Sequence, residues 1–304
     1  MDLKSITMDY KTLVMIGMCK NAGKTTALNL LLDQKDLAVT SVGKDGETVD
    51  AVTKTPKPQI FVKKGTLVAT ASSLLPACSV SREILVATSI PSPIGEIVVF
   101  RCVDDGFVEL AGPSITSQLV ELKKIFFSLG AKKIIIDGAL SRKSISSTKI
   151  ANAAVLSTGA SYDKNMHKVI DDTAFILDLY SLPVCKNAPR KSEDILESIE
   201  KGKNELYTSG ALSEGVLKKV SSLKNVNQIK ITVDDPSKIL ASRETVCTFI
   251  KRGGILQLIK SIKIAAVTVN PYSAYGWNFD KDVFKKEMQL RTSIPVINAW
   301  EEQK

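Results

Sequence analysis

The sequence has little of what several common kinds of catalytic site require. Histidine occurs once, at His167, and the five cysteines are scattered along the chain without a C-x-x-C pair. A single histidine cannot form a metal cluster, and with no cysteine or serine partner near it in the sequence a hydrolase triad is disfavoured. Scattered cysteines in odd number predict neither a disulfide framework nor a zinc site, and they fit a reducing cytoplasm.

Aromatic residues and long apolar runs are scarce as well. Aromatics make up 6% of the chain, and the longest apolar runs, such as 264–269, are far shorter than a membrane span. The net charge of +9 is spread along the chain without a dense basic block or a zinc-finger or RNA-recognition pattern. We therefore expect no nucleic-acid partner, no membrane span and no signal peptide.

What the chain does contain is strand and helix patterns in alternation. With 44% hydrophobic and 24% charged residues, 304 residues can bury a large core. The pattern predicts an α/β protein with a P-loop NTPase-like, mostly parallel sheet flanked by helices, a β-rich insertion at about 54–111 and a C-terminal α/β segment. A polar stretch at 185–204 predicts a boundary between domains 1–185 and 186–304, and no internal repeat is expected.

Three local patterns predict individual elements. Asp104-Asp105-Gly106 lies between two apolar runs, which is a hairpin signal for the strands on either side. Gly112-Pro113-Ser114 has the chemistry of a serine-capped helix start, so a helix is expected over 116–129. Apolar spacing predicts another helix over 236–250.

The stretch 13–26, LVMIGMCKNAGKTT, is typical of a strand, a phosphate loop and a helix. A polyphosphate needs converging backbone N–H donors, a lysine for its outer oxygens and a hydroxyl for magnesium, and Gly23, Lys24 and Thr25 supply these parts. The usual spacing puts the first glycine at position 18, but Gly17 lies one residue earlier, so this loop begins differently. The residues expected to bind nucleotide here are Lys20, Asn21, Ala22, Gly23, Lys24, Thr25 and Thr26.

Acidic residues at strand ends suggest the magnesium site. The apolar run 132–136 ends at Asp137, the form of the strand that holds magnesium in P-loop proteins, so Asp137 joins Lys24 as a candidate catalytic residue. Thr25 and Asp45 complete the predicted metal ligands, although Asp45-Gly46 is equally typical of a simple turn. The basic segments 54–64 and 142–143 could meet anionic oxygens or be solvated loops.

The base of the nucleotide is predicted from a different segment. The guanine-reading Asn-Lys-x-Asp signature is absent, whereas Asn270 follows a buried strand and has Tyr272 and Tyr275 beside it. We expect Asn270 to contact the base, with ATP preferred over GTP and Mg²⁺ as the companion ion.

Two resemblances extend these expectations. The loop Lys-Asn-Ala-Gly-Lys-Thr-Thr resembles that of the P-loop NTPase branch containing molybdopterin-guanine dinucleotide accessory proteins and dethiobiotin synthetase. In some relatives a lysine at the position of Lys20 contacts phosphates across a dimer, which implies a possible homo-oligomer. The segments 41–47, 63–70, 137–144 and 270–273 look like those of the B subunit of the lysine 5,6-aminomutase reactivase.

The second resemblance implies an ATP-linked accessory factor of bacterial lysine fermentation. Such a factor acts with a second reactivase ATPase subunit to restore a cobalamin- and pyridoxal-phosphate-dependent aminomutase, so both proteins are expected partners. Only Gly23, Lys24 and Thr25 match the general P-loop pattern residue by residue. A small-molecule ligase or kinase of the dethiobiotin synthetase type, or a non-hydrolysing subunit with a degenerate loop, remain alternatives.

Overall fold

The structure is a computed structural model that describes residues 2–43, 59–138, 150–185, 192 and 194–302. These residues form two compact units. The first unit contains the described residues up to Thr173 and those from Ile264 onward, and the second contains those within Ala174–Lys263. The chain thus leaves the first unit once and returns to it.

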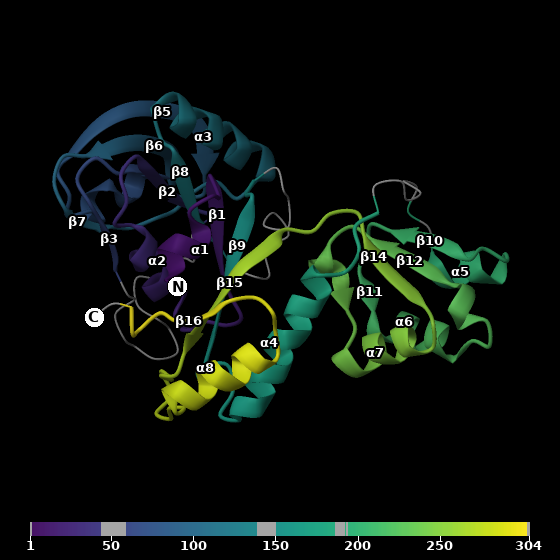
Figure 1. Cartoon of the computed structure of the whole chain (residues 1–304). Helices are drawn as coiled ribbons and strands as arrows, with labels where there is room; N and C mark the ends of the chain where they lie inside the picture. The colour runs from purple at the N-terminus through teal and green to yellow at the C-terminus, as the bar shows by residue number, and fades with distance from the viewer. Residues whose placement is uncertain (1, 44–58, 139–149, 186–191, 193, 303–304) are drawn as a thin grey trace. The chain divides into compact units, whose positions relative to one another are not determined.

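The first unit is built on one sheet of nine strands (Figure 1). In spatial order the strands are β16 (Val296–Asn298), β15 (Lys263–Asn270), β9 (Ala153–Gly159), β1 (Thr12–Gly17), β8 (Lys133–Asp137), β2 (Leu37–Ser41), β4 (Leu67–Ala71), β6 (Gly95–Cys102) and β5 (Arg82–Ser92). Neighbours from β9 to β4 are parallel, as are β15 and β16, whereas β6 is antiparallel to both β4 and β5. The predicted α/β class with a mostly parallel sheet is confirmed.

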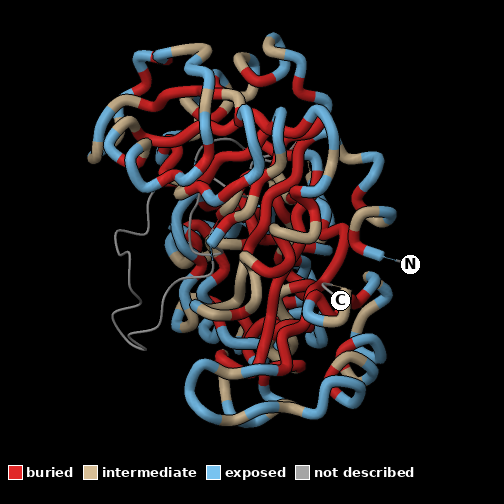
Figure 2. Tube along the Cα trace, turned by 90° about the vertical axis from the view of Figure 1, so that its left-hand side faces the viewer, coloured by how far each residue is buried: buried red, intermediate tan, exposed pale blue. Residues whose placement is uncertain are grey.

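The central strands are buried on both faces, which explains their unbroken apolar sequences. Every residue of β2 and β9 is buried, as are five of the six residues of β1. Parallel sheets covered by helices require such continuous hydrophobic runs, because no side of the strand meets water. Figure 2 shows the buried residues concentrated in the interior and the exposed ones along the periphery.

Helices cover this sheet and supply the rest of the core. They are α1 (Leu3–Thr7), α2 (Lys24–Leu31), the 3₁₀ turn η1 (Ser72–Ala77), α3 (Thr116–Ser128), the first half of α4 (Met166–Tyr180) and α8 (Lys281–Leu290). Leu28 and Leu31 of α2 belong to the same buried cluster as Leu13 and Met15 of β1. The helix that follows the predicted phosphate loop is therefore anchored in the core.

The predicted hairpin at Asp104-Asp105-Gly106 is wrong. β6 forms a hairpin with the strand before it, β5, and not with the strand after it. That following strand, β7 (Gly106–Val108), pairs with β3 (Ile60–Val62). The two aspartates bind neighbouring loops, since Asp104 accepts the Ser81 backbone N–H at 2.7 Å and Asp105 accepts that of Lys64 at 2.8 Å. These contacts turn the chain away from β6.

The expected serine cap of α3 is also wrong, because the N-cap residue is Ile115 and its side chain makes no capping bond. The preceding residues are held against the end of β2. The Gly112 N–H donates to Ser41 Oγ at 3.0 Å, and the Gly43 N–H donates to the Pro113 carbonyl at 3.1 Å. We call residues 112–113 the strap over β2. The helix begins only after this strap.

The division of the chain differs from the expected domains 1–185 and 186–304. The structure instead places the division at Thr173/Ala174 and returns the chain to the first unit at Ile264. The reason is that β15 is hydrogen-bonded beside β9 and brings β16 and α8 with it. The described residues 194–204 of the polar stretch belong to the second unit and include a helix, Ile195–Glu200.

The second unit uses the same order of elements twice, which is a strand, a two-residue strand and a helix. Its elements are α5 (Ile195–Glu200), β10 (Glu205–Thr208), β11 (Leu212–Ser213), α6 (Glu214–Ser222), η2 (Val226–Gln228), β12 (Lys230–Val233), η3 (Pro236–Lys238), β13 (Ile239–Leu240), α7 (Arg243–Lys251) and β14 (Ile255–Leu258). β10, β12 and β14 form a parallel sheet, β11 pairs with β13, and both α6 and α7 have a serine N-cap. Connections of different length hide this repeat in the sequence.

The same repeat corrects the helix expected over 236–250. Asp235 caps only the short turn η3, and the chain then forms β13 beside β11. The helix proper, α7, begins after its N-cap Ser242, whose hydroxyl accepts the Thr245 backbone N–H. The stretch expected as one helix therefore forms three elements, η3, β13 and α7, with β13 paired to β11.

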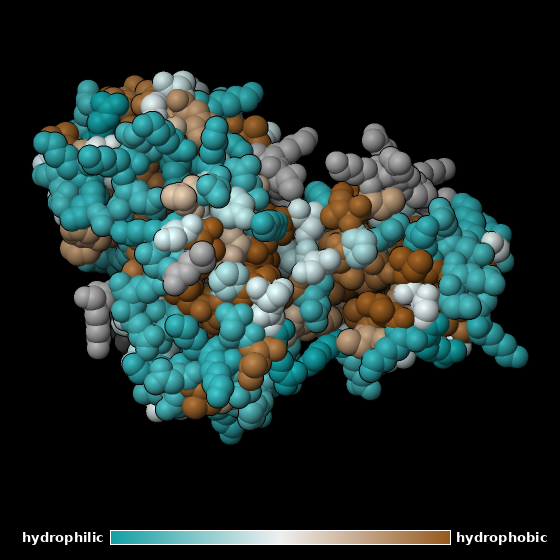
Figure 3. Space-filling view, viewed as in Figure 1, coloured by the Kyte–Doolittle hydropathy of each residue, from teal (hydrophilic) through white to brown (hydrophobic). Residues whose placement is uncertain are grey.

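None of the described helices is long and apolar enough to cross a membrane. Figure 3 shows mainly hydrophilic residues on the visible face of the larger unit. Its exposed hydrophobic side chains include Met8, Ile84 and Leu290.

We predict that Gly112→Ala destabilises the first unit. A Cβ at this position would overlap the Ser41 carbonyl oxygen, so the strap over β2 has to move. Overpacking of this kind typically lowers the free energy of unfolding by about 1–3 kcal/mol. Gly215→Ala is the control, because a Cβ there meets nothing within 4 Å and alanine favours the helix. Equal melting temperatures for the wild type and Gly112→Ala in calorimetry would contradict this account.

Candidate functional site

The strand order makes the carboxyl end of β1 the edge of the sheet where a ligand is expected. From β1 the chain passes over β8 to reach β2, and from β8 it later crosses to the other side of β1 to form β9. Open α/β sheets bind ligands outside the carboxyl ends of strands where the winding reverses in this way. In register, Met15 of β1 lies beside Asp137 of β8, and Gly17 lies beside Ser157 of β9. The predicted phosphate loop leaves β1 at this point.

The loop reaches α2 through two left-handed residues. Asn21 has φ 59°, and Gly23, the N-cap of α2, has φ 87°. Among the described side chains none caps α2, and its first turn holds no acidic residue. The N–H groups of that first turn and the positive end of the helix dipole are therefore suited to an anion.

The Lys24 side chain joins the two segments predicted to form the site. Its Nζ lies 3.0 Å from Asp137 Oδ1 and donates to the Gly138 carbonyl at 2.6 Å. Both side chains of the pair are about one-fifth exposed, at 22% for Lys24 and 20% for Asp137. The geometry brings together a lysine and an aspartate that lie more than a hundred residues apart in the sequence. The sequence did not predict that Lys24 binds the Gly138 carbonyl. The one signal for this contact was the position of Gly138 directly after Asp137.

The remaining residues of the predicted loop differ in burial. Lys20 is exposed, Asn21 and Thr25 are half-buried, and Ala22 and Thr26 are buried at 2% and 6% exposure. Thr25 therefore keeps the accessibility that a magnesium ligand needs, whereas Thr26 is packed into the unit.

The predicted metal ligands are only partly within the described residues. Asp45 lies outside them, as do Arg142 and Lys143 of the predicted anion-binding segment. Within the described part of the chain, no three His, Cys, Asp or Glu side chains gather into a metal-binding group. Magnesium commonly uses one or two carboxylates together with phosphate oxygens and water, which is the arrangement Asp137 and Thr25 can serve.

Asn270 lies at the end of β15 and contacts the phosphate loop. Its Nδ2 donates to the Asn21 carbonyl at 3.2 Å, and its Oδ1 accepts the Tyr272 backbone N–H at 3.0 Å. The residue is only 5% exposed. The structure thus brings Asn270 to the predicted site, but the amide expected to contact a base is bound to backbone groups.

The aromatic residues after Asn270 are fixed to the end of β9. Trp277 Nε1 donates to the Ala160 carbonyl at 2.9 Å, and the Ala274 N–H donates to Ser161 Oγ at 3.1 Å. The rings of Tyr275 and Trp277 stack with centroids 5.6 Å apart. Ala274 and Trp277 therefore hold the segment after Asn270 against the end of β9, a contact that no local sequence signal indicated.

The end of β2 lies beside Asp137, where Ser41 is its partner in register. The Val42 N–H donates to the Asp137 carbonyl at 2.8 Å, and Ser41 Oγ accepts the Gly112 N–H. The strap over β2 thus supports the segment next to Asp137.

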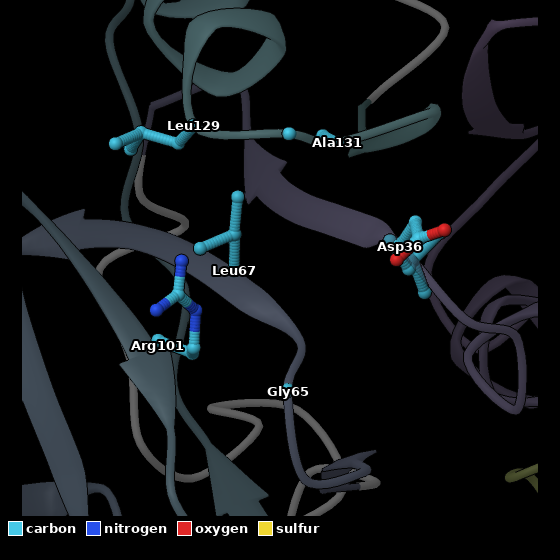
Figure 4. A pocket seen from close by; sticks show the side chains of 8 residues that line it. Asp36, Gly65, Leu67, Arg101, Leu129 and Ala131 are labelled. Carbon is cyan, nitrogen blue, oxygen red and sulfur yellow. The ribbon is translucent and has the colours of Figure 1, made fainter.

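A separate small pocket lies at the other end of the sheet. It has a volume of about 100 Å³ and includes Asp36, Leu67, Arg101 and Leu129 in its lining (Figure 4). Asp36 immediately precedes β2, so this pocket is at the amino ends of the strands. It is smaller than the ~300–1,000 Å³ usual for small-molecule sites.

Comparisons of the chain with protein-family models, with curated proteins and with solved structures find no match. Function is therefore inferred from the residues of the site.

We predict that Cys19 in the phosphate loop reacts slowly with alkylating agents. Burial raises the pKa of its thiol to about 11, so the reactive thiolate is scarce near neutral pH. At pH 8.5 its alkylation by iodoacetamide should be about 100-fold slower than in urea-unfolded protein, where the thiol has its ordinary pKa. The rate should rise about tenfold per pH unit toward pH 11, because folding disfavours the thiolate until its pKa is reached. Mass spectrometry of the Cys19 peptide measures both rates, and equal rates at pH 8.5 would contradict the prediction.

Proposed function

We propose that this protein binds a magnesium nucleoside triphosphate, with ATP expected, at the loop between β1 and α2. The observation that carries the proposal is the contact of Lys24 with Asp137 at the carboxyl ends of two adjacent strands. A lysine at a helix N-terminus beside a strand-end aspartate is the arrangement by which P-loop proteins hold phosphates and magnesium. The mostly parallel sheet is compatible with a P-loop NTPase-like fold.

The residues of the site fit such a ligand in three respects. The uncapped N-terminus of α2 offers N–H donors to phosphate oxygens, and Lys24 offers a charge to the outer ones. Thr25 and Asp137 are the residues that would hold magnesium, directly or through water. Bound magnesium would supply charge neutralisation on the phosphates.

We further propose that the nucleotide cycle serves a protein partner. The sequence has one histidine, His167, which lies exposed in α4 and not on β1, on β8 or in the loops that follow these strands. Asp137 itself is engaged by Lys24, and an aspartate that positions magnesium is not a strong base. The resemblance to an aminomutase reactivase makes a second reactivase ATPase subunit and an aminomutase the partners to test. An exposed Lys20 is consistent with a contribution across a homo-oligomer, as some similar loops make.

The first prediction is that Lys24→Ala weakens binding of Mg-ATP by about 1.5–3 kcal/mol, because one charge-assisted contact to a phosphate is lost. Isothermal titration calorimetry on the wild type and the variant measures this. Lys132→Ala is the matched control, since Lys132 also pairs with an aspartate, Asp36, at 2.7 Å but precedes β8 at its amino end. The control should bind as the wild type does. Equal affinity for Lys24→Ala and the wild type would refute the proposed site.

The second prediction is slow ATP hydrolysis by the isolated chain and acceleration by partners. A cation supplied or positioned by a partner raises the rate of P-loop proteins by about three to five orders of magnitude. Steady-state ATP hydrolysis is measured first with the isolated chain, and then after addition of a second reactivase subunit and an inactivated aminomutase. The rate with Lys24→Ala gives the background. Turnover near the ~10 s⁻¹ typical of self-sufficient enzymes, unchanged by either addition, would instead favour a small-molecule ligase or kinase.

A further inference from the structure

Asn270 occupies a space that two glycines leave open. A Cβ added to Gly23 would lie 2.9 Å from Asn270 Cβ, and one added to Gly159 would lie 2.6 Å from the Asn270 carbonyl oxygen. Real Cβ atoms do not approach other atoms so closely, so both positions need glycine as long as Asn270 lies there. The loop after β1, the end of β9 and the end of β15 therefore fit together around one residue, Asn270.

The bonds of Asn270 join these three segments. Its side chain donates to the Asn21 carbonyl, its backbone carbonyl accepts the Ala160 N–H at 2.9 Å, and its Oδ1 accepts from Tyr272. Asn21 is left-handed, with φ 59°, a conformation that is uncommon for residues other than glycine and that asparagine adopts more readily than most. The hydrogen bond from Asn270 Nδ2 restrains the backbone of Asn21 at its carbonyl group.

We propose that Asn270 is a positioning residue, which holds the phosphate loop in the backbone conformation that receives a phosphate chain. This inference rests on the proposed function for the nature of the ligand, but not for the contact itself. It differs from the base contact expected from the sequence. A group that reads a base needs its amide edge open to the ligand, whereas Asn270 is a buried residue whose amide Nδ2 and Oδ1 are each bound to a backbone group.

Phosphate binding without a base distinguishes the two roles. Calorimetry with inorganic tripolyphosphate and with ATP, each in the presence of magnesium, compares the wild type with Asn270→Ala. A positioning residue acts on the phosphates, so both ligands should bind about tenfold more weakly, the effect of losing one hydrogen bond that orders the loop. A weakening confined to ATP would overturn the proposal in favour of base recognition.

Asn278→Ala is the matched control within the same segment. Asn278 Oδ1 accepts the Ser273 N–H at 3.2 Å, a local bond of the kind that Asn270 makes to Tyr272. Asn278 is exposed and forms a β-bridge with Tyr272, so it shares the segment but contributes to its local order. This control should leave both affinities unchanged, and a loss equal to that of Asn270→Ala would show that only the order of segment 271–278 matters.

Hydrogen exchange of the nucleotide-free protein tests the contact without any ligand. Peptides covering 18–24 should exchange about tenfold faster in Asn270→Ala than in the wild type, with no change in Asn278→Ala. Unchanged exchange would overturn the proposal even if nucleotide affinity falls. If the wild type binds neither tripolyphosphate nor ATP, the proposed function fails, and exchange alone then decides whether Asn270 holds the loop. Should Asn270→Ala not fold, Asn270→Ser serves in its place, because its hydroxyl can still accept from Tyr272.

Discussion

The pairing of Lys24 with Asp137 depends on β1 and β8 being adjacent and parallel. Each strand brings its last residues to the same edge of the sheet, so the loop after β1 and the turn after β8 meet there. The pairing also compensates two charges that are each about four-fifths shielded from water. An unpaired charge at such a place is unfavourable, so the lysine and the aspartate stabilise each other until a ligand offers replacement contacts.

Much of the first unit can be understood as support for that edge of the sheet. α2 is anchored by Leu28 and Leu31 in the core, which fixes the helix whose N-terminus faces the loop. On one side Asn270 fits between Gly23 and Gly159, and on the other Gly112 lies against the end of β2. These close approaches to the backbone leave no room for side chains, which is why glycines recur around the site.

The two units illustrate different uses of parallel strands. In the first, the buried strands β1 and β8 bring Lys24 and Asp137 together at their carboxyl ends. In the second, β12 ends beside Asp235, whose carboxylate is used locally to cap η3, and Tyr207 of β10 donates to Asp234 at 2.5 Å. Asp234 and Asp235, two described residues at that edge, are therefore bound by neighbouring polar groups of the same unit.

The sequence by itself determined the strand, loop and helix around Lys24, because an unbroken apolar run followed by small and turn-forming residues has few other solutions. It also determined the strand ending at Asp137 and the α/β class. Only the tertiary structure decided that β7 pairs with β3, that residues from Ile264 onward return to the first sheet, and that β13 interrupts the apolar pattern before α7. The expected contact of Asn270 with a base stays a prediction. The contact of Asn270 with the Asn21 carbonyl was likewise decided only by the tertiary structure. Local patterns reflect the solvent exposure and turn chemistry of neighbouring residues, whereas strand partners and the fit of Asn270 between two glycines arise from segments far apart in the sequence.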